Sequence, residues 1–374
     1  MTADHPPTLD RNARLALIAL LSAEGIGNRR AMELVTLFHT PEAALKAPAG
    51  EVASALNVPL QVGRQVVKAG RSMEAAEKKL AAAERCGARV VTFWDEEYPE
   101  RLKGISDPPA LLYVRGENSP LYQYAVAVVG TRTPSEHGRR MAVRIARELA
   151  TTGVTVVSGM AMGIDSLAHE GALSAGGRTI AVLGSGVDVV YPPSNRQLYE
   201  RIIAQGAVFT EYPPGTGPDR HHFPQRNRII SGLSLGTVIV EAGAKSGALI
   251  TAKLALEQGR ELFAVPGAAG DMKSAGVNQL LRDGAAHLVE KGSEVVEHLK
   301  SRLAPVLNVS AAMAVPKMEG AEKTIYNLLE AGPVLVDELI RRSNLGAVEV
   351  SRVLTSMQLK SLVQRLPGAR VGRA

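Results

Sequence analysis

Short turns of glycine, serine and arginine follow several apolar runs in the middle of this chain, and these residue types can bind anions. The first turn consists of Gly130, Thr131 and Arg132, between the apolar run 125–129 and Ser135, a typical helix-capping residue. The first N–H groups of a helix have no intrahelical partner, so a phosphate or carboxylate is favoured there, and an arginine adds a fork of donors. The turn is a candidate anion site, although Gly130 could equally relieve crowding and Arg132 be a solvated surface residue.

The same residue types recur after later apolar runs. Small residues let a ligand approach the backbone closely and leave N–H groups for a phosphate. Two arginines, Arg226 and Arg228, begin an expected helix, where like charges are unfavourable unless an anion lies between them. The predicted anion-binding residues besides the first turn are Ser158, Gly159, Gly163, Gly184, Ser185, Gly186, Arg226, Asn227, Arg228, Lys245 and Ser246.

A catalytic or metal site can also be drawn from this region. Asp165 and His169 would share a helix face, and the residues that could join them are Asp188, Glu211, Glu241, His221 and His222. However, no second histidine lies at helical spacing from His169. The chain also has neither a glycine-rich phosphate loop that ends in Lys-Ser/Thr nor the Gly-x-Gly-x-x-Gly motif of dinucleotide-binding folds. We therefore expect Asp165 to cap its helix and His169 to pack or bind backbone. We also expect no metal, no cofactor and no enzymatic activity.

These turns need a scaffold, and the alternation of apolar runs with segments of helical spacing indicates a doubly wound, mostly parallel sheet over residues 88–302. In such a sheet, ligands bind beyond the carboxyl ends of the strands, where these turns lie. The prolines at 99, 108 and 109 exclude a helix between the first two strands. The expected strands are residues 88–94, 110–115, 125–129, 154–157, 179–183, 207–210, 237–241, 261–265 and 285–289.

Helical spacing before this sheet predicts a small helical domain of the helix-hairpin-helix type over residues 1–87. Its last segment, residues 60–87, is expected to be a single helix. The Gly-Ile-Gly turn at 25–27 could present N–H groups to a DNA phosphate or be an ordinary tight turn between helices.

The end of the chain predicts a second small domain. Residues 303–320 contain prolines and alanines without a clear period, so we expect a linker without core residues. Residues 321–374 follow the winged-helix order of three helices and a hairpin. The third of these helices offers few basic residues, which leaves DNA binding, protein contact and packing open.

Composition restricts the class of protein. A formal net charge of +6 favours a polyanionic partner only mildly, because 43 basic residues face 37 acidic ones. The single cysteine, Cys86, cannot form a disulfide framework within the chain and fits a reducing compartment. The polar N-terminal stretch and the lack of a run of about 20 apolar residues argue against export and membrane spanning. We therefore expect a cytoplasmic location.

The glycine turns belong to a long ordered series of motifs. From about Tyr98 the series contains Val-Gly-Thr-Arg, Ser-Gly-Met-Ala-Met-Gly-Ile-Asp, Tyr-Pro-Pro-Ser-Asn, Glu-Tyr-Pro-Pro-Gly-Thr, Phe-Pro-Gln-Arg-Asn-Arg-Ile-Ile-Ser-Gly, Ser-Gly-Ala-Leu-Ile-Thr-Ala and Phe-Ala-Val-Pro-Gly. In this order the motifs closely resemble the DNA processing protein A (DprA, also called Smf) family of bacterial single-strand DNA-binding recombination mediators. Two small departures, Thr210 and Ala248 where a serine is expected, put no function in doubt.

The resemblance implies an extended Rossmann-like domain that binds and protects incoming single-stranded DNA, forms homodimers and loads the RecA recombinase during natural transformation. It implies phosphate contacts for Arg132, the turn 184–186, Arg226 and Arg228. Duplex contact through the end domains stays open, as does a competing class of Rossmann-like nucleotide hydrolases. The resemblance further implies dimer and recombinase contact near residues 278–296, with the candidate interface residues Leu280, Leu281 and Leu288.

Overall fold

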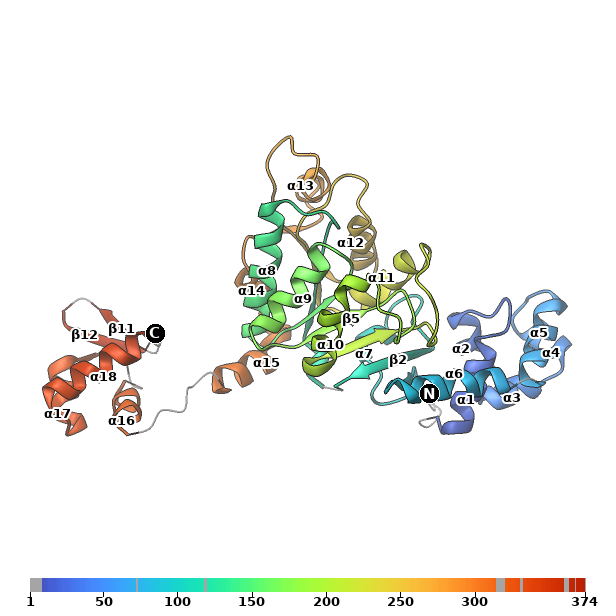
Figure 1. The fold of residues 1–374 in the computed structure, drawn as a ribbon, viewed down its shortest axis with the longest axis horizontal. Helices are drawn as coiled ribbons and strands as arrows, with labels where there is room; N and C mark the ends of the chain where they lie inside the picture. Colours follow the sequence, from blue (N-terminus) through green and yellow to red (C-terminus); the bar gives the residue numbers. More distant parts are fainter. Residues whose placement is uncertain are drawn as a thin grey trace. The chain divides into compact units, whose positions relative to one another are not determined.

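A nine-stranded sheet is the centre of the first of two units in the computed structural model (Figure 1). The structure describes residues 9–71, 73–117, 120–313, 320–329, 332–359, 363–366 and 368–373. The first unit is Met1–Ser310 and the second is Ala311–Ala374. Among the described residues, no helix is long and apolar enough to cross a membrane.

The strand order of the large sheet is β1-β2-β6-β5-β4-β3-β7-β8-β9. Strands β3 to β9 pair in parallel, whereas β1 and β2 add an antiparallel edge. The chain winds outward from β3 through β4, β5 and β6, then returns to place β7 on the other side of β3, which confirms the doubly wound, mostly parallel sheet. The strands are β1 (Arg89–Thr92), β2 (Leu111–Gly116), β3 (Ala125–Val129), β4 (Thr155–Ser158), β5 (Thr179–Val182), β6 (Ala207–Thr210), β7 (Gly236–Ile239), β8 (Glu261–Ala264) and β9 (His287–Leu288).

Helices cover both faces of this sheet, which is why its central strands are apolar throughout. Val126 and Val128 of β3 pack into one core with α8 and α9, whereas Ala125, Ala127 and Val129 face a second core with α11 and α12. The helices of this part are α7 (Glu100–Lys103), α8 (Glu136–Thr151), α9 (Ile164–Ser174), α10 (Arg196–Gln205), α11 (His222–Leu233), α12 (Ala248–Glu257), α13 (Ala275–Arg282), α14 (Gly292–His298) and α15 (Lys300–Met313).

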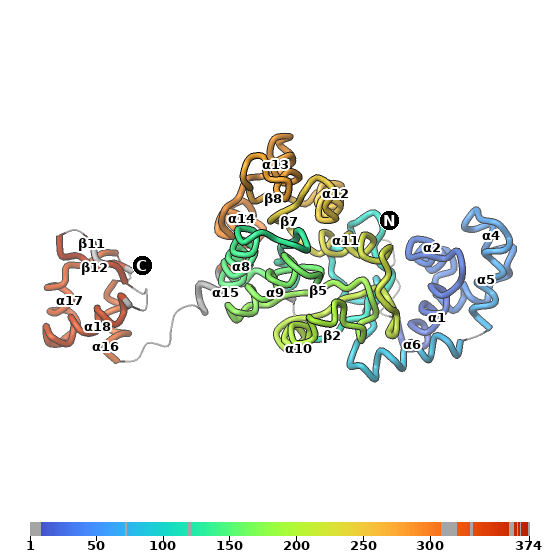
Figure 2. Tube along the Cα trace, turned by 45° about the horizontal axis from the view of Figure 1, so that its top comes forward, coloured from blue at the N-terminus to red at the C-terminus, as the bar shows by residue number. Residues whose placement is uncertain are grey.

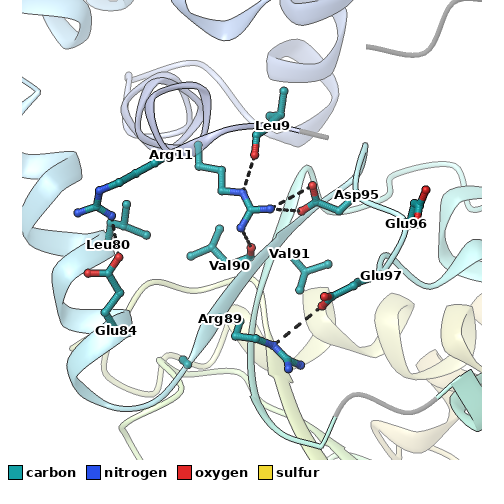
Figure 3. Close-up of a pocket in the computed structure, with 12 residues that line it drawn as sticks. Leu9, Arg11, Leu80, Glu84, Arg89, Val90, Val91, Asp95, Glu96 and Glu97 are labelled. Atoms are coloured by element: carbon teal, nitrogen blue, oxygen red, sulfur yellow. Dashed lines mark hydrogen bonds and ion pairs between the residues drawn. The ribbon is translucent and has the colours of Figure 1, made fainter. Parts of the chain in front are cut away.

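The N-terminal helices join the sheet at β1. Arg14 of α1 donates to the Val90 carbonyl oxygen at 3.0 Å and to the Asp95 carboxylate, which also accepts from Thr92 N–H at 2.7 Å. Figure 3 shows Val90 and Asp95 at this edge of the sheet. These contacts satisfy backbone groups at the outer edge of the sheet, beside a cavity of about 520 Å³. The helices are α1 (Arg11–Leu20), α2 (Asn28–Phe38), α3 (Pro41–Lys46), α4 (Ala49–Ala55), α5 (Leu60–Arg71) and α6 (Glu74–Arg85), so the single helix expected over 60–87 is two helices.

Two expectations about prolines are wrong. The one-turn helix α7 lies between β1 and β2, because Pro99 stands at its N-cap and needs no helical N–H. Helix α15 runs through most of the expected linker, and its Leu303 and Val306 are buried in the core. Burying two aliphatic side chains is worth about 3–6 kcal/mol. That gain outweighs the roughly 3 kcal/mol that Pro305 costs inside a helix.

The second unit has the expected winged-helix order. Its three-stranded sheet, β10-β12-β11, packs with its helices around Ile325, Leu339, Leu354 and Met357. Lys360, which was expected at the end of the third helix, lies outside the described residues. The elements are α16 (Ala321–Leu328), β10 (Val334–Leu335), α17 (Val336–Ser343), α18 (Ala347–Leu359), β11 (Val363–Leu366) and β12 (Arg370–Arg373).

Candidate functional site

A cavity of about 580 Å³ lies beyond the carboxyl ends of β3 and β7, where the winding direction of the sheet reverses. This is the place at which open α/β sheets bind ligands. Residues of α9, α11 and α12 line it, and Figure 2 shows where these helices lie in the fold. The cavity brings together six of the predicted residues, namely Gly130, Thr131, Arg132, Arg226, Asn227 and Ser246.

Arg132 is exposed at this cavity and is held by an aromatic ring. Its guanidinium carbon lies 5.4 Å from the centroid of Phe223, whose ring is 5.6 Å from that of Tyr191. A stacked guanidinium keeps its N–H donors free at the edge of the plane. No described residue accepts a hydrogen bond from Arg132, so the fork is available to an anion in the cavity.

The N-terminus of α8 is already occupied by a carboxylate. Glu241 is buried and accepts from the Ser135 hydroxyl and from Ser135 N–H at 3.0 Å, while its carbonyl oxygen accepts from Thr131 N–H at 2.8 Å. A Cβ at Gly138 would lie 2.6 Å from a Glu241 carboxylate oxygen, so a glycine is needed there. The expectation of a bound anion at this helix start is therefore corrected, because the protein supplies its own.

Two buried charged residues, Arg226 and Asp165, line the cavity. Burial lowers the pKa of Arg226 to about 10, opposed by the charge of Asp165. Burial raises the pKa of Asp165, opposed by the charge of Arg226 and by N–H groups of residues 159 and 161. The guanidinium donates to the Val182 carbonyl and fills the space beside Gly159, where any Cβ would overlap it. Gly159 thus seats Arg226 rather than a ligand.

Arg228 lies outside this cavity. It forms ion pairs with Glu211 at 2.7 Å and with Asp107 at 3.0 Å, and its side chain is only 12% exposed. Residues two apart on a helix point to different sides, so Arg226 is buried near the charge of Asp165, whereas Arg228 pairs with Glu211 and Asp107. The argument that an anion must lie between them is therefore wrong, and a phosphate would have to compete with two carboxylates at Arg228.

The Gly-Ser-Gly turn at 184–186 does not point its N–H groups into open space. All three residues are buried, and Gly186 N–H donates to the Thr216 carbonyl oxygen at 2.8 Å. A Cβ at Gly184 would lie 3.0 Å from the ring of Phe223. The turn is covered by the segment that carries Phe223, so it supports that ring instead of presenting donors to a ligand.

The remaining predicted residues have structural contacts or lie at the rim. The Ser158 hydroxyl is buried and donates to the Val128 carbonyl oxygen at 2.7 Å. Gly163 has φ 83° and packs against the backbone of residues 131 and 132, where a side chain would clash. It therefore positions the Arg132 turn. Lys245 is exposed next to Ser246.

The cavity residues that were not predicted include Tyr191, Arg220 and Phe223. Tyr191 and Phe223 belong to the Tyr-Pro-Pro and Phe-Pro-Gln motifs. Those aromatic residues next to prolines were the available signal in the sequence.

The residues of the catalytic alternative are dispersed. Among the described residues, no three histidine, cysteine or carboxylate side chains could hold a metal ion. His169 is buried, and its Nδ1 lies 2.6 Å from the hydroxyl oxygen of Thr179 rather than at a backbone group. The residue at the N-cap of α9 is Gly163, and Asp165 accepts from the N–H groups of residues 159 and 161, which precede the helix, so the expected capping of α9 by Asp165 is wrong.

The candidate interface leucines differ in exposure. Leu280 and Leu281 are half-buried against the core, so neither is a free apolar side chain. Leu288 is 56% exposed on β9, the last strand of the sheet.

The motifs and the fold agree with a known family. Residues 89–300 match the family described as DNA recombination-mediator protein A, and residues 309–369 match the DprA winged helix domain. The chain belongs to the DprA (Smf) family. Among DprA relatives, the Smf protein of Synechocystis sp. is 38% identical over 312 residues, which are 75% of this chain and 78% of that protein.

Two solved DprA structures resemble this one. DprA from Streptococcus pneumoniae has a TM-score of 0.67 and 34% identity, covering 76% of this chain and 97% of that chain. DprA from Helicobacter pylori, solved to describe its single-stranded DNA binding mode, has a TM-score of 0.52 and 31% identity, covering 57% of this chain and 97% of that chain. The Rossmann-like fold expected from the motifs is therefore confirmed.

Proposed function

We propose that this chain binds single-stranded DNA in the cavity beyond β3 and β7 and acts as a recombination mediator. The observation that carries the proposal is the exposed Arg132, stacked on Phe223 with its donors free, at the switch point of the sheet. The family membership supports it, and the Helicobacter pylori DprA is a relative described as binding single-stranded DNA.

The cavity suits a phosphate and an adjoining base. Arg132 can bind a phosphate through two parallel N–H groups, and the hydroxyl groups of Thr131 and Ser246 line the same space. The rings of Phe223 and Tyr191 give a base an apolar surface, and stacking tolerates every base. Phosphate contacts carry no sequence information, so binding is expected to be largely independent of sequence.

The finer role follows the family. The chain would protect incoming DNA and load the RecA recombinase in natural transformation, acting in the cytoplasm as a homodimer. Exposed Leu288 on β9 supports a protein contact at this side of the sheet. Duplex DNA contact would belong to the N-terminal helices or to the winged-helix unit.

Salt-dependent binding to one oligonucleotide in single- and double-stranded form tests the proposal. Affinity for the single strand should be higher and should fall steeply with salt, with a log–log slope of about −0.7 per neutralised phosphate. A single-strand affinity that is unchanged between low and moderate salt would contradict the electrostatic account.

We also propose that the chain has no hydrolytic activity. A nucleotide hydrolase would need a free carboxylate at the cavity, but Glu241 is bound to Ser135 and Asp165 lies beside Arg226. Incubation with nucleoside monophosphates and a search for released base tests this. Product that survives repurification and disappears in both Glu241→Ala and Asp165→Ala would favour the hydrolase.

A further inference from the structure

The outer face of α8 carries four exposed arginines, Arg139, Arg140, Arg144 and Arg147. Three of them, Arg140, Arg144 and Arg147, have the i, i+4, i+7 spacing that places side chains in one row along a helix. Figure 1 shows α8 on the outside of the sheet. We call these four residues the α8 arginine face.

This face has little acidic compensation. Among the described residues, the one acidic side chain that accepts a hydrogen bond from this face is Glu148, which binds Arg144 at 2.8 Å and also accepts from Gly292 N–H at 2.7 Å. The side chains of Arg139, Arg140 and Arg147 form no hydrogen bond or ion pair with any described residue. Like charges three and four residues apart destabilise a helix, so the row does not contribute to the stability of α8.

The α8 arginine face continues directly from the cavity. Helix α8 begins four residues after Arg132, and Lys273 donates to the Thr133 carbonyl oxygen at 3.1 Å in the connecting turn. The exposed cations Arg132 and Lys273 therefore lie at the turn that leads into α8. Arginine suits phosphate oxygens because its planar fork makes two parallel hydrogen bonds.

We infer that the α8 arginine face binds the backbone of the same DNA single strand whose other part lies in the cavity. This inference rests on the proposed function and extends the site. Helix α8 has 16 residues, and at about 1.5 Å per residue it is roughly 24 Å long. At about 3.4 Å per nucleotide, as in one strand of a duplex, the face spans at most about seven nucleotides beyond the cavity.

Helix α5 offers a matched control. Arg64, Lys68 and Arg71 have the same i, i+4, i+7 spacing and are exposed, but none of them lines the cavity. Replacing three basic residues by alanine on either helix removes the same charge. Alanine is the best helix former, so both triple variants should fold, which circular dichroism checks.

The experiment measures binding of the full chain to oligothymidylates of about five and about fifteen nucleotides, lengths within the usual range for single-strand sites. The variant Arg140→Ala/Arg144→Ala/Arg147→Ala should bind the long strand about tenfold more weakly, since three exposed ion pairs together are worth on the order of 1.4 kcal/mol. Its salt slope should be shallower by about 2. It should bind the short strand normally.

The α5 variant Arg64→Ala/Lys68→Ala/Arg71→Ala should bind both strands like the unsubstituted chain. Equal losses of long-strand affinity in the two triple variants would mean that only the net charge matters, and would overturn the inference. An unchanged long-strand affinity in the α8 variant would overturn it as well. Arg132→Ala should weaken the binding of both the short and the long oligothymidylate. If Arg132→Ala leaves the affinity for both oligothymidylates unchanged, the proposal that DNA binds in the cavity is wrong, whatever the α8 variant shows.

Discussion

The buried histidine His169 is held in one neutral form by its neighbours. The Thr179 hydroxyl donates to the Val156 carbonyl oxygen at 2.7 Å, so it must accept from His169 at 2.6 Å. The proton therefore sits on Nδ1. Burial, together with the positive charge of Arg226, lowers the pKa of His169 to about 3. His169 thus has a packing role.

This pKa predicts a loss of stability in mild acid. The unfolded chain binds a proton at the ordinary histidine pKa of 6.5, whereas the folded chain does not until about 3, so stability is full above pH 6.5 and falls as the pH is lowered through this window. Between pH 7 and pH 5 the loss is about 2 kcal/mol. Thermal unfolding of the unsubstituted chain and of His169→Asn should show the loss only in the former. The same pH dependence in both proteins would contradict the assignment.

Among the secondary-structure elements, α8 depends on a carboxylate more than a hundred residues away in the chain. Glu241→Ala would leave Ser135 N–H buried without its acceptor, which costs about 1–3 kcal/mol. Glu136→Ala in the first turn of α8 is the control, because its side chain is exposed and contributes about 0.3–1 kcal/mol. We expect a clearly lower melting temperature for Glu241→Ala. Equal melting temperatures would mean that Glu241 does not cap α8.

The elements show which features the sequence could reveal. The strands were predictable because both of their faces are buried, which makes the runs apolar, and the turns after them were visible as glycines and serines. The partners of those turns were not visible. Glu241 reaches Ser135, and Gly159 seats Arg226, only after the chain has folded. Long-range contacts of this kind decide which predicted residues face the cavity.

Helix α15 and the pair Arg226 and Arg228 are two further cases in which long-range contacts were not visible in the sequence. Pro305 predicted a linker because the pattern did not reveal the burial of Leu303 and Val306. Arg226 and Arg228 were expected to act together, yet Arg226 donates to the Val182 carbonyl oxygen whereas Arg228 forms an ion pair with Glu211. The spacing in the sequence was sufficient to predict candidate residues, whereas contacts between distant parts of the chain determine what each residue does.

For the chain as a whole, we expect the winged-helix unit to be dispensable for most single-strand affinity. A chain ending at residue 313 should keep its affinity within about tenfold, or 1.4 kcal/mol, because the cavity lies in the first unit. A chain ending at residue 302 should lose about 3–6 kcal/mol of stability with Leu303 and Val306. Single-strand binding checks the first expectation, and thermal unfolding checks the second. If the chain ending at residue 313 loses more than about tenfold in single-strand affinity, the second unit is a principal binding surface.

The most direct test of single-strand binding in the cavity is the affinity of Arg132→Ala. A hydrogen bond to a charged group is worth roughly 1.5–3 kcal/mol, so binding should weaken about tenfold to a hundredfold while the melting temperature stays nearly unchanged. Arg132→Lys should recover only part, since the charge returns without the fork. Arg64→Ala, an exposed arginine away from the cavity, should bind normally. If folded Arg132→Ala binds single-stranded DNA as tightly as the unsubstituted chain, the cavity is not the DNA site.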